Sequence, residues 1–209
     1  MVYSQNYYGS IYLYVPITMR CEKMKTLIVY GTRYGATALT SQEIAKILLE
    51  ENFEVKVVDA KKEKIKDISE FELVIVGGGL KMGRWTGESD DFLKNFQKDL
   101  AQKKVAIFVS SAVKSLLERQ GKTEDLQKIK KSHLEDEALK YHLNPIALGL
   151  FGGVMDKNKM GFIFRRTLGV LIKQFEAAGF KETSPGLIDT RDLAEIRKWT
   201  EELAQKALQ

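Results

Sequence analysis

Residues 31–37 combine the side chains and backbone features that bind a phosphate group. The segment joins a predicted strand to a predicted helix, so its amide groups lie at a helix N-terminus, which attracts anions. Thr32 and Thr37 supply hydroxyl groups, and Arg33 supplies positive charge. Gly35 permits the positive φ that curls such a loop. The segment therefore predicts a phosphate site, and the alternative is an ordinary tight turn.

Two other kinds of phosphate loop do not match this segment. The dinucleotide fingerprint Gly-x-Gly-x-x-Gly needs a glycine where Arg33 stands, although Asp59 after the second predicted strand resembles the acid that binds ribose. A Walker loop needs Gly-Lys followed by Ser or Thr, which does not follow the first strand. NAD is therefore the weaker alternative.

Short apolar runs alternate with amphipathic helical patterns from residue 26 onward, which indicates a parallel sheet covered on both faces. The expected strands are 26–30, 54–58, 73–76, 105–109 and 146–150. The expected helices are 37–51, 88–101, 123–141, 160–178 and 191–207, with Thr123 as an N-cap. This alternation predicts an α/β fold, the flavodoxin-like doubly wound sheet of five parallel strands in the order 2-1-3-4-5. Ligands bind beyond the carboxyl ends of such strands, here the loops 31–37, 77–87, 110–114 and 151–161.

Composition narrows the class of protein. The chain has 209 residues, 44% of them hydrophobic and 29% charged, which predicts one folded domain. A net charge of +5 suits anionic partners, but no RNA-binding motif or zinc-finger spacing points to nucleic acid. The single cysteine, Cys21, excludes an intramolecular disulfide and an iron–sulfur cluster, so we expect a cytoplasmic protein. His133 and His142 are spaced wrongly for a metal pair and are expected to be solvated helix residues.

Residues 1–23 are expected to form a loosely ordered N-terminal extension, and residues 24–209 the folded domain. The extension is too polar to span a membrane, and it lacks the basic region and cleavage site of a secretory signal. Met24 directly precedes the first predicted strand and looks like a natural start, so both Met1 and Met24 remain candidates.

The run Thr-Arg-Tyr-Gly-Ala-Thr at 32–37 resembles the phosphate loop of flavodoxins, in which a Thr/Ser-rich turn wraps the 5′-phosphate of FMN without a metal ion. The loop 77–85 is similar to that of the flavodoxin-domain subgroup containing quinone-dependent protoporphyrinogen IX dehydrogenase. The resemblance continues at 151–153 and 189–191 and covers residues 24 to about 205. It implies FMN as cofactor and no metal. The cofactor-binding residues expected from the loops and the resemblance are Thr32, Arg33, Tyr34, Gly35, Ala36, Thr37, Gly78, Gly79, Leu80, Lys81, Met82, Gly83, Trp85, Ser110, Ser111 and Ala112.

The second and third loops would surround the flavin ring. Gly78 and Gly79 let the backbone approach its edge, and Trp85 is our choice for stacking on its face. The alternative is that Trp85 anchors the loop on the following helix. The side chains of Lys81 and Arg84 would stabilise negative charge on the reduced ring. In the third loop, the amides of Ser110, Ser111 and Ala112 are better candidates for the ring edge than the hydroxyls.

Residues 162–178 form an amphipathic basic helix with two interpretations. Its apolar positions, Phe164, Leu168, Leu171, Ile172, Phe175 and Ala178, share one side. Packing of this side on the sheet is the simpler interpretation. The alternative is a peripheral helix that dips into the inner face of the membrane while Arg165 and Arg166 meet lipid headgroups.

Two functions follow from the resemblance. The first is an FMN-dependent oxidoreductase that oxidises a protoporphyrinogen-type substrate with a quinone acceptor, its chemistry carried by the flavin and not by a catalytic side chain. Phe151, Gly152, Gly153 and Met155 would edge that substrate pocket. The second is a flavodoxin-type carrier that passes electrons between redox proteins. A module without cofactor that binds a partner is a third interpretation.

Overall fold

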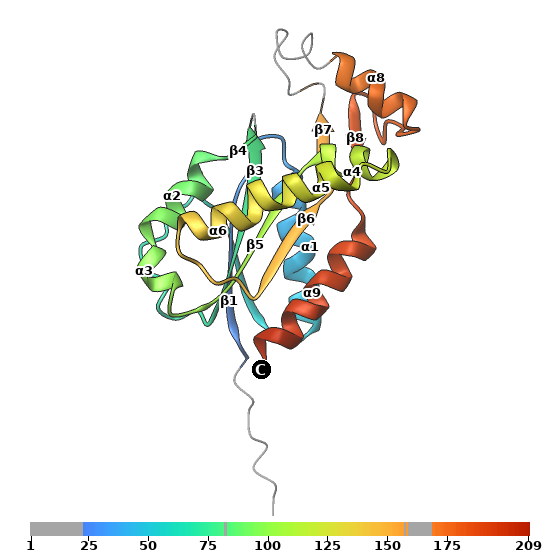
Figure 1. Ribbon diagram of the computed structural model, residues 1–209. Helices are drawn as coiled ribbons and strands as arrows, with labels where there is room; N and C mark the ends of the chain where they lie inside the picture. The colour runs from blue at the N-terminus through green and yellow to red at the C-terminus, as the bar shows by residue number, and fades with distance from the viewer. Residues whose placement is uncertain (1–22, 82, 157, 159–168) are drawn as a thin grey trace, which may run out of the picture.

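The computed structural model describes residues 23–81, 83–156, 158 and 169–209. Its centre is a sheet of parallel strands in the order β2-β1-β3-β5-β6, and the short strand β4 pairs antiparallel with β3 (Figure 1). The strands are β1 (Lys25–Gly31), β2 (Glu54–Asp59), β3 (Leu73–Lys81), β4 (Arg84–Trp85), β5 (Lys104–Ser110) and β6 (Ala147–Phe151). The predicted flavodoxin-like fold is therefore confirmed.

The register of the sheet aligns the ends of the strands along one edge. Gly79 of β3 lies opposite Ser110 of β5, and Ser110 lies opposite Phe151 of β6. Gly31, the last residue of β1, lies opposite Gly78. The loops that follow these four strands consequently meet in one place.

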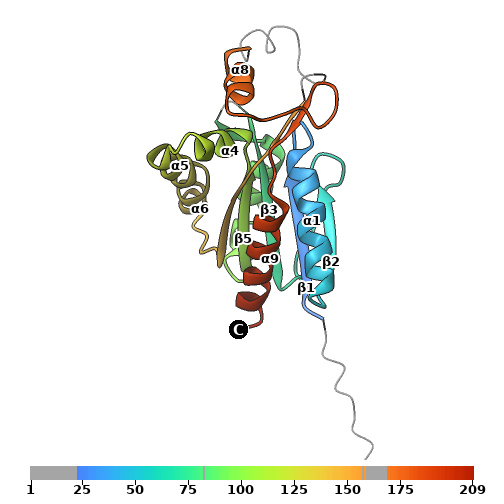
Figure 2. The same ribbon diagram turned by 90° about the vertical axis from the view of Figure 1, so that its right-hand side faces the viewer.

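Helices cover both faces of the sheet because its central strands are buried on both sides (Figures 1 and 2). On one face, α1 (Ala36–Glu50) and α9 (Leu193–Ala207) pack through Ile44 and Ile196 into one core cluster. On the other, Phe92 of α2 (Gly87–Asn95) and Ala138 of α6 (Asp136–Lys140) belong to a second cluster.

The helices differ from the prediction at three places. The helix expected at 123–141 consists of α5 (Thr123–Lys130), a π-helical turn η1 (Lys131–Glu135) and α6. Thr123 is the first helical residue and Lys122 holds the N-cap position, so the predicted N-cap is wrong. The helix expected at 88–101 is divided at Phe96 into α2 and α3 (Gln97–Leu100). The helix α4 (Ala112–Arg119) was not predicted.

A small unit stands beyond the edge where the strands end, and its two strands were not predicted. It consists of the antiparallel strands β7 (Val154–Asp156) and β8 (Leu187–Asp189) and the helix α8 (Gly169–Ala177), and it lies at the top of Figure 1. Met155, Ile188 and Phe175 of this unit join Leu116 of α4 in a third hydrophobic cluster. The prediction for residues 160–168, like that for residues 1–22 of the N-terminal extension, falls outside the described residues.

Candidate functional site

A pocket of about 430 Å³ opens where the loops after β1, β3, β5 and β6 meet. This volume lies within the range of small-molecule sites, about 300–1,000 Å³. The predicted residues that line it are Thr32, Arg33, Tyr34, Ala36, Thr37, Gly79, Leu80, Gly83, Ser110, Ser111 and Ala112. The other lining residues are Val113, Ile129, His133, Gly153, Val154, Met155 and Leu171.

The loop after β1 is held in shape by its own residues. Gly35 has a φ of 96°, which is the left-handed region that favours glycine, and it occupies the N-cap position of α1. Its amide hydrogen is donated to Thr32 Oγ1 at 3.0 Å. Thr37 is buried beneath the loop, and a Cβ on Gly79 would lie 3.2 Å from its Oγ1. The loop therefore packs tightly on β3.

Two helices begin at the pocket, and both leave their first amides without a side-chain cap. Neither α1 nor α4 has a capping side chain or an acidic residue in its first turn. The first turns of α2, α5, α6 and α9 each contain at least one Asp or Glu, and Asp192 caps α9. The positive ends of the α1 and α4 dipoles are thus not neutralised by the protein's own carboxylates, which favours an anion in the pocket.

The third loop keeps the expected Ala112 amide available, whereas other polar groups of the loop are engaged within the protein. The amide of Ser111 already donates to the carbonyl oxygen of Phe151 at 2.9 Å. The hydroxyl of Ser110 donates to Thr40 Oγ1 at 3.2 Å and is buried. The first amides of α4, at Ala112 and Val113, have no partner within the helix and are the donors that remain at this end of the pocket.

The glycines of β3 are explained by packing within the protein. A Cβ on Gly77 would collide with the Phe108 ring, and a Cβ on Gly78 would lie 2.5 Å from the indole of Trp85. The Trp85 side chain is 7% exposed and donates its Nε1 hydrogen to the carbonyl oxygen of His133 at 2.8 Å. Neither Gly78 nor Trp85 is among the residues that line the pocket. The hydrogen bond from Trp85 joins the second loop to η1.

The aromatic ring in the pocket lining is that of Tyr34. Its hydroxyl accepts a hydrogen bond from Arg33 Nε at 3.0 Å, and the guanidinium carbon lies 5.4 Å from the ring centre. Tyr34 also packs against the hydrophobic cluster that contains Met155. The first loop therefore provides both the cation and the aromatic surface. Met82 and the side chain of Lys81 lie outside what the structure describes.

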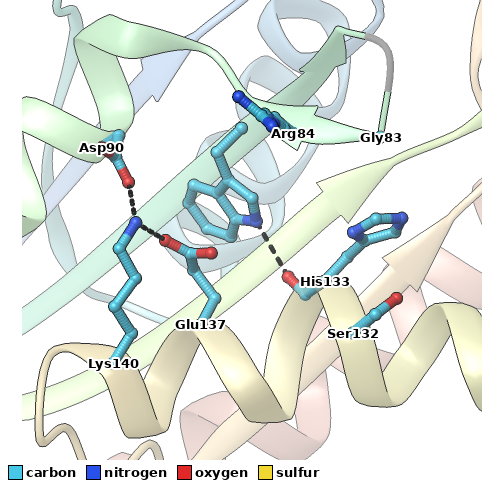
Figure 3. A pocket seen from close by; sticks show the side chains of 8 residues that line it. Gly83, Arg84, Asp90, Ser132, His133, Glu137 and Lys140 are labelled. Carbon is cyan, nitrogen blue, oxygen red and sulfur yellow. Dashed lines mark hydrogen bonds and ion pairs between the residues drawn. The ribbon is translucent and has the colours of Figure 1, made fainter.

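A second cavity of about 430 Å³ adjoins the first and shares Gly83 and His133 with it (Figure 3). Lys140 Nζ bridges Asp90 Oδ1 at 2.6 Å and Glu137 Oε1 at 2.9 Å. Tyr141 also donates its hydroxyl hydrogen to Asp90, at 2.5 Å. Burial raises the pKa of Asp90, but the hydrogen bonds from Lys140 and Tyr141 lower it by more. The net shift of this pKa is therefore downward. This second cavity, unlike the first, is lined mainly by charged and polar side chains.

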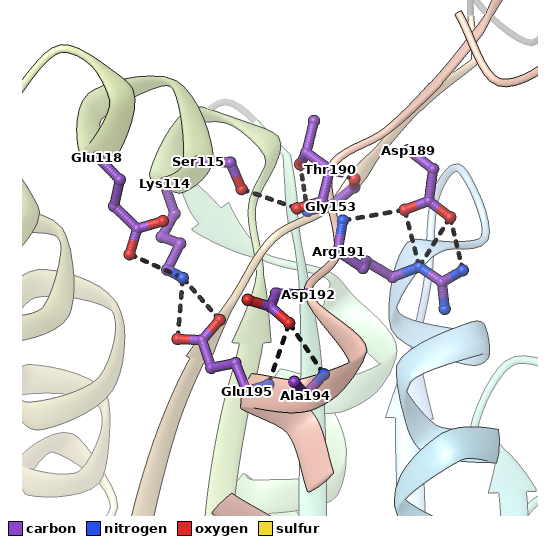
Figure 4. Close-up of polar contacts among 10 residues, drawn as sticks. All are labelled: Lys114, Ser115, Glu118, Gly153, Asp189, Thr190, Arg191, Asp192, Ala194 and Glu195. Atoms are coloured by element: carbon purple, nitrogen blue, oxygen red, sulfur yellow. Dashed lines mark hydrogen bonds and ion pairs between the residues drawn. The ribbon is translucent and has the colours of Figure 1, made fainter. Parts of the chain in front are cut away.

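Residues near the C-terminus hold the loop after β6 and the helix α4 in place (Figure 4). Thr190 Oγ1 accepts from the Gly153 amide at 3.0 Å, and the Thr190 amide donates to the Gly153 carbonyl at 2.9 Å. Lys114 Nζ, on a side chain that is 8% exposed, contacts Glu195 Oε2 at 2.7 Å and Glu118 Oε1 at 2.8 Å. These contacts join the start of α4 to the segment that leads into α9.

The described part of the amphipathic helix packs its apolar side inward. Phe175 is fully buried, and Leu171 and Ile172 pack against the same hydrophobic cluster. Arg165 and Arg166 lie outside the described residues. Among the residues that the structure describes, no helix is long and apolar enough to cross a membrane. Within the same residues, no group of three or more His, Cys, Asp or Glu side chains forms a metal site.

Several lining residues reach the pocket through tertiary contacts that no local sequence pattern indicates. Val154, Met155 and Leu171 reach the pocket because β7 and α8 fold back over the sheet edge, a contact between segments far apart in the chain. Ile129 and His133 reach it from α5 and η1. His133 is half-buried, not solvated as expected. The sequence identified Gly153 and Met155 at the pocket edge only through the family resemblance.

Comparison with known proteins identifies the class. Residues 27–183 match the flavodoxin domain family, and the chain therefore belongs to that family. FMN is accordingly the cofactor of this domain. No curated protein matches the chain.

Solved structures agree in fold. A short-chain flavodoxin associated with a non-canonical PDU bacterial microcompartment has a TM-score of 0.54 at 14% identity, covering 88% of this chain and 99% of that one. A flavodoxin from the domain Archaea has a TM-score of 0.51 at 15% identity, covering 89% and 100%. The two-electron reduced flavodoxin of Megasphaera elsdenii has a TM-score of 0.50 at 15% identity, covering 86% and 98%.

The residues of the pocket fit FMN chemically. A phosphate group carries the negative charge that the start of α1 lacks, and Arg33 lies in the same loop. A flat apolar ring suits a lining that includes Tyr34, Met155 and Leu171.

Proposed function

We propose that this chain is a redox protein that binds FMN in the pocket between the starts of α1 and α4. The observation that carries the proposal is the pair of helix N-termini that open onto one pocket without a cap or an acid. An anionic cofactor supplies the negative charge that both helices lack. The proposal concerns the position of the cofactor and the roles of the residues around it.

The phosphate end is assigned to the first loop. The amides of Ala36 and Thr37 have no partner within α1 and would donate to phosphate oxygens. The hydroxyl oxygen of Thr32 already accepts the Gly35 amide, so its hydrogen is available to the phosphate. Arg33 would balance the charge of the phosphate from the rim.

The ring end is assigned to the third loop and to the small unit of β7, β8 and α8. FMN supplies the electron chemistry, because its ring accepts and releases electrons. The α4 amides at Ala112 and Val113 would stabilise negative charge that accumulates on the ring when it is reduced. Tyr34, Met155 and Leu171 would exclude water from its faces.

Comparing FMN with riboflavin tests the phosphate assignment, since riboflavin lacks the phosphate. Ala36→Asp places a carboxylate in the first turn of α1, and the matched control Ala36→Asn has the same shape without the charge. Repulsion of about 1–2 kcal/mol would weaken FMN binding by roughly 5-fold to 30-fold in the aspartate variant and leave riboflavin affinity within about twofold. Equal effects on both flavins would contradict the assignment, as would the absence of flavin bands near 370 and 450 nm in the FMN-treated protein.

Flavodoxins work with redox partner proteins, and membership of the family supports an electron-carrier function for this chain. In this proposal the chain passes electrons between such partners. Its net charge of +5 favours acidic partners, because complementary charge speeds association. An acidic ferredoxin-type partner is expected to exchange electrons faster at low salt than at high salt.

A second candidate function is that of an enzyme with its own substrate. The observation that favours it is the apolar wall of Val154, Met155 and Leu171, which the small unit adds beside the pocket. That wall would receive a protoporphyrinogen-type donor, with a quinone as acceptor. Peripheral contact with the inner membrane face would rest on residues 160–168, because the apolar side of α8 is packed. Anaerobic mixing of the FMN-loaded protein with protoporphyrinogen tests this candidate, and flavin that stays oxidised would exclude it.

A further inference from the structure

The side chain of His133 lies between the cofactor pocket and the polar cavity beside it. His133 lines both cavities, and the two share only one other residue, Gly83, among those that the structure describes. A Cβ on Gly83 would lie 3.9 Å from the Cε1 atom of the His133 ring. The imidazole is therefore placed to meet a ligand on one side and a polar cavity on the other (Figure 3).

The backbone holds His133 in an unusual conformation. It lies in η1, a π-helical turn within a segment that is otherwise α-helical, and such turns occur frequently at functional sites. Its carbonyl oxygen accepts the indole hydrogen of Trp85 at 2.8 Å, which fixes the turn against β4. Leu134, the next residue, is fully buried in the core. The position of the imidazole is therefore set by packing on both sides.

The polar cavity holds a carboxyl group four residues further along the helix. Glu137 lines the cavity with a side chain that is 14% exposed, and it shares Lys140 with Asp90. The other charged group in this cavity is Arg84 of β4. On the side of the cofactor pocket, the ionisable groups are Arg33 and Tyr34.

The pKa values of His133 and Glu137 are shifted toward one another. Burial lowers the pKa of His133 below its ordinary value. Burial raises the pKa of Glu137, and the neighbouring Asp90 carboxylate adds to the rise, while Lys140 opposes it. The two pKa values are therefore closer together in the protein than in water.

We propose that His133 exchanges a proton with a quinone-type substrate bound in the cofactor pocket, and that the cavity containing Glu137 connects it to solvent. This proposal rests on FMN binding in that pocket. FMN, when bound and reduced, would supply the hydride that carries both electrons to one carbonyl oxygen of the quinone. The imidazolium of His133 would give a proton to the other oxygen, which yields the hydroquinone. The neutral imidazole would then take a proton from water in the polar cavity.

Two oxidants separate proton transfer from electron transfer. Menadione takes two electrons and two protons in total, whereas ferricyanide takes single electrons and no proton. The protein with FMN is photoreduced without oxygen and mixed with each oxidant in turn. His133→Asn is expected to slow oxidation by menadione about 100-fold, a typical contribution of general acid catalysis, and to leave the ferricyanide rate within about twofold. His133→Gln is expected to behave in the same way.

The other histidine provides a matched control. His142 follows α6 with a φ of 51°, a conformation that asparagine tolerates, and it lines neither cavity. His142→Asn is expected to leave both rates unchanged. In the wild-type protein the menadione rate is expected to rise as the pH falls through the pKa of His133, and this rise is expected to disappear in His133→Asn.

A measurement without turnover tests the placement of the imidazole. In proton NMR spectra of the protein, the two histidines give two Cε1 signals, which the asparagine variants assign. Addition of FMN is expected to shift the His133 signal and not that of His142. If FMN binds but neither the His133 signal nor the menadione rate responds, the proton-transfer proposal is wrong and the cofactor site stands. If FMN does not bind, the proposed function itself is wrong.

Discussion

Thr190 holds the loop after β6 through its side chain and its backbone. Its hydroxyl oxygen accepts the Gly153 amide hydrogen at 3.0 Å, and the side chain is almost fully buried. Valine has nearly the same shape as threonine but cannot accept a hydrogen bond. Thr190→Val therefore leaves the Gly153 amide buried without a partner, at an expected cost of about 1–3 kcal/mol in the free energy of unfolding.

The same change is expected to reach the cofactor pocket. A Cβ on Gly153 would lie 2.5 Å from the Ala112 amide nitrogen, and both residues line the pocket. A displaced Gly153 would therefore move the first turn of α4. We expect the FMN dissociation constant to rise, because the α4 amides are donors only in their present position.

Urea unfolding measures the first effect, and fluorescence titration of the protein with FMN measures the second. Thr183→Val is the matched control, since its exposed hydroxyl makes one long contact, 3.3 Å, with the Leu187 carbonyl. The control is expected to change the free energy of unfolding by no more than about 0.5 kcal/mol. An unfolding midpoint and an FMN affinity equal to those of the wild type in Thr190→Val would refute this account of the loop.

Three further changes test other parts of the structure. Gly78→Ala places a Cβ 2.5 Å from the Trp85 indole and is expected to lower the free energy of unfolding by about 1–3 kcal/mol, measured by urea denaturation. Trp85→Phe removes the hydrogen bond to the His133 carbonyl, so we expect a loss of about 1 kcal/mol in stability and an unchanged FMN affinity; a large loss of affinity would return Trp85 to the cofactor. The pKa of Asp90 is lowered, so its carboxylate stabilises the fold at pH values above the ordinary pKa of 3.8. This contribution is lost as the pH falls through the lowered pKa. Asp90→Asn is therefore expected to be less stable than the wild type at pH 7, with a difference that shrinks in acid unfolding measurements at pH 3.

The five parallel strands and the first loop were predictable because their signals are local. Apolar runs ending in glycine or serine identify buried parallel strands, and the order of the loops follows from the topology. Thr32, Arg33 and Gly35 could be interpreted individually, because a loop before a helix has few conformations that suit an anion.

The side chains that depend on tertiary packing were not predictable in this way. Trp85 has the right type for stacking, but its orientation depends on where the His133 carbonyl lies, 48 residues away. The Ser111 amide, which the sequence predicted as a donor to the ligand, pairs instead with the Phe151 carbonyl. This contact exists only once β6 joins the sheet. No periodicity in the sequence indicates the π-helical turn that places His133.

The uncapped N-termini of α1 and α4 are also expected to affect the rate at which the protein is degraded in a cell. A missing N-cap costs a helix about 0.5–2 kcal/mol, so without its ligand the protein begins from a reduced stability. A ligand present at 100 times its dissociation constant adds about 2.7 kcal/mol to a folded state that alone binds it. The fraction of chains exposed to proteases is therefore expected to depend on the supply of flavin, and cells short of riboflavin are expected to contain less of this protein at the same rate of synthesis.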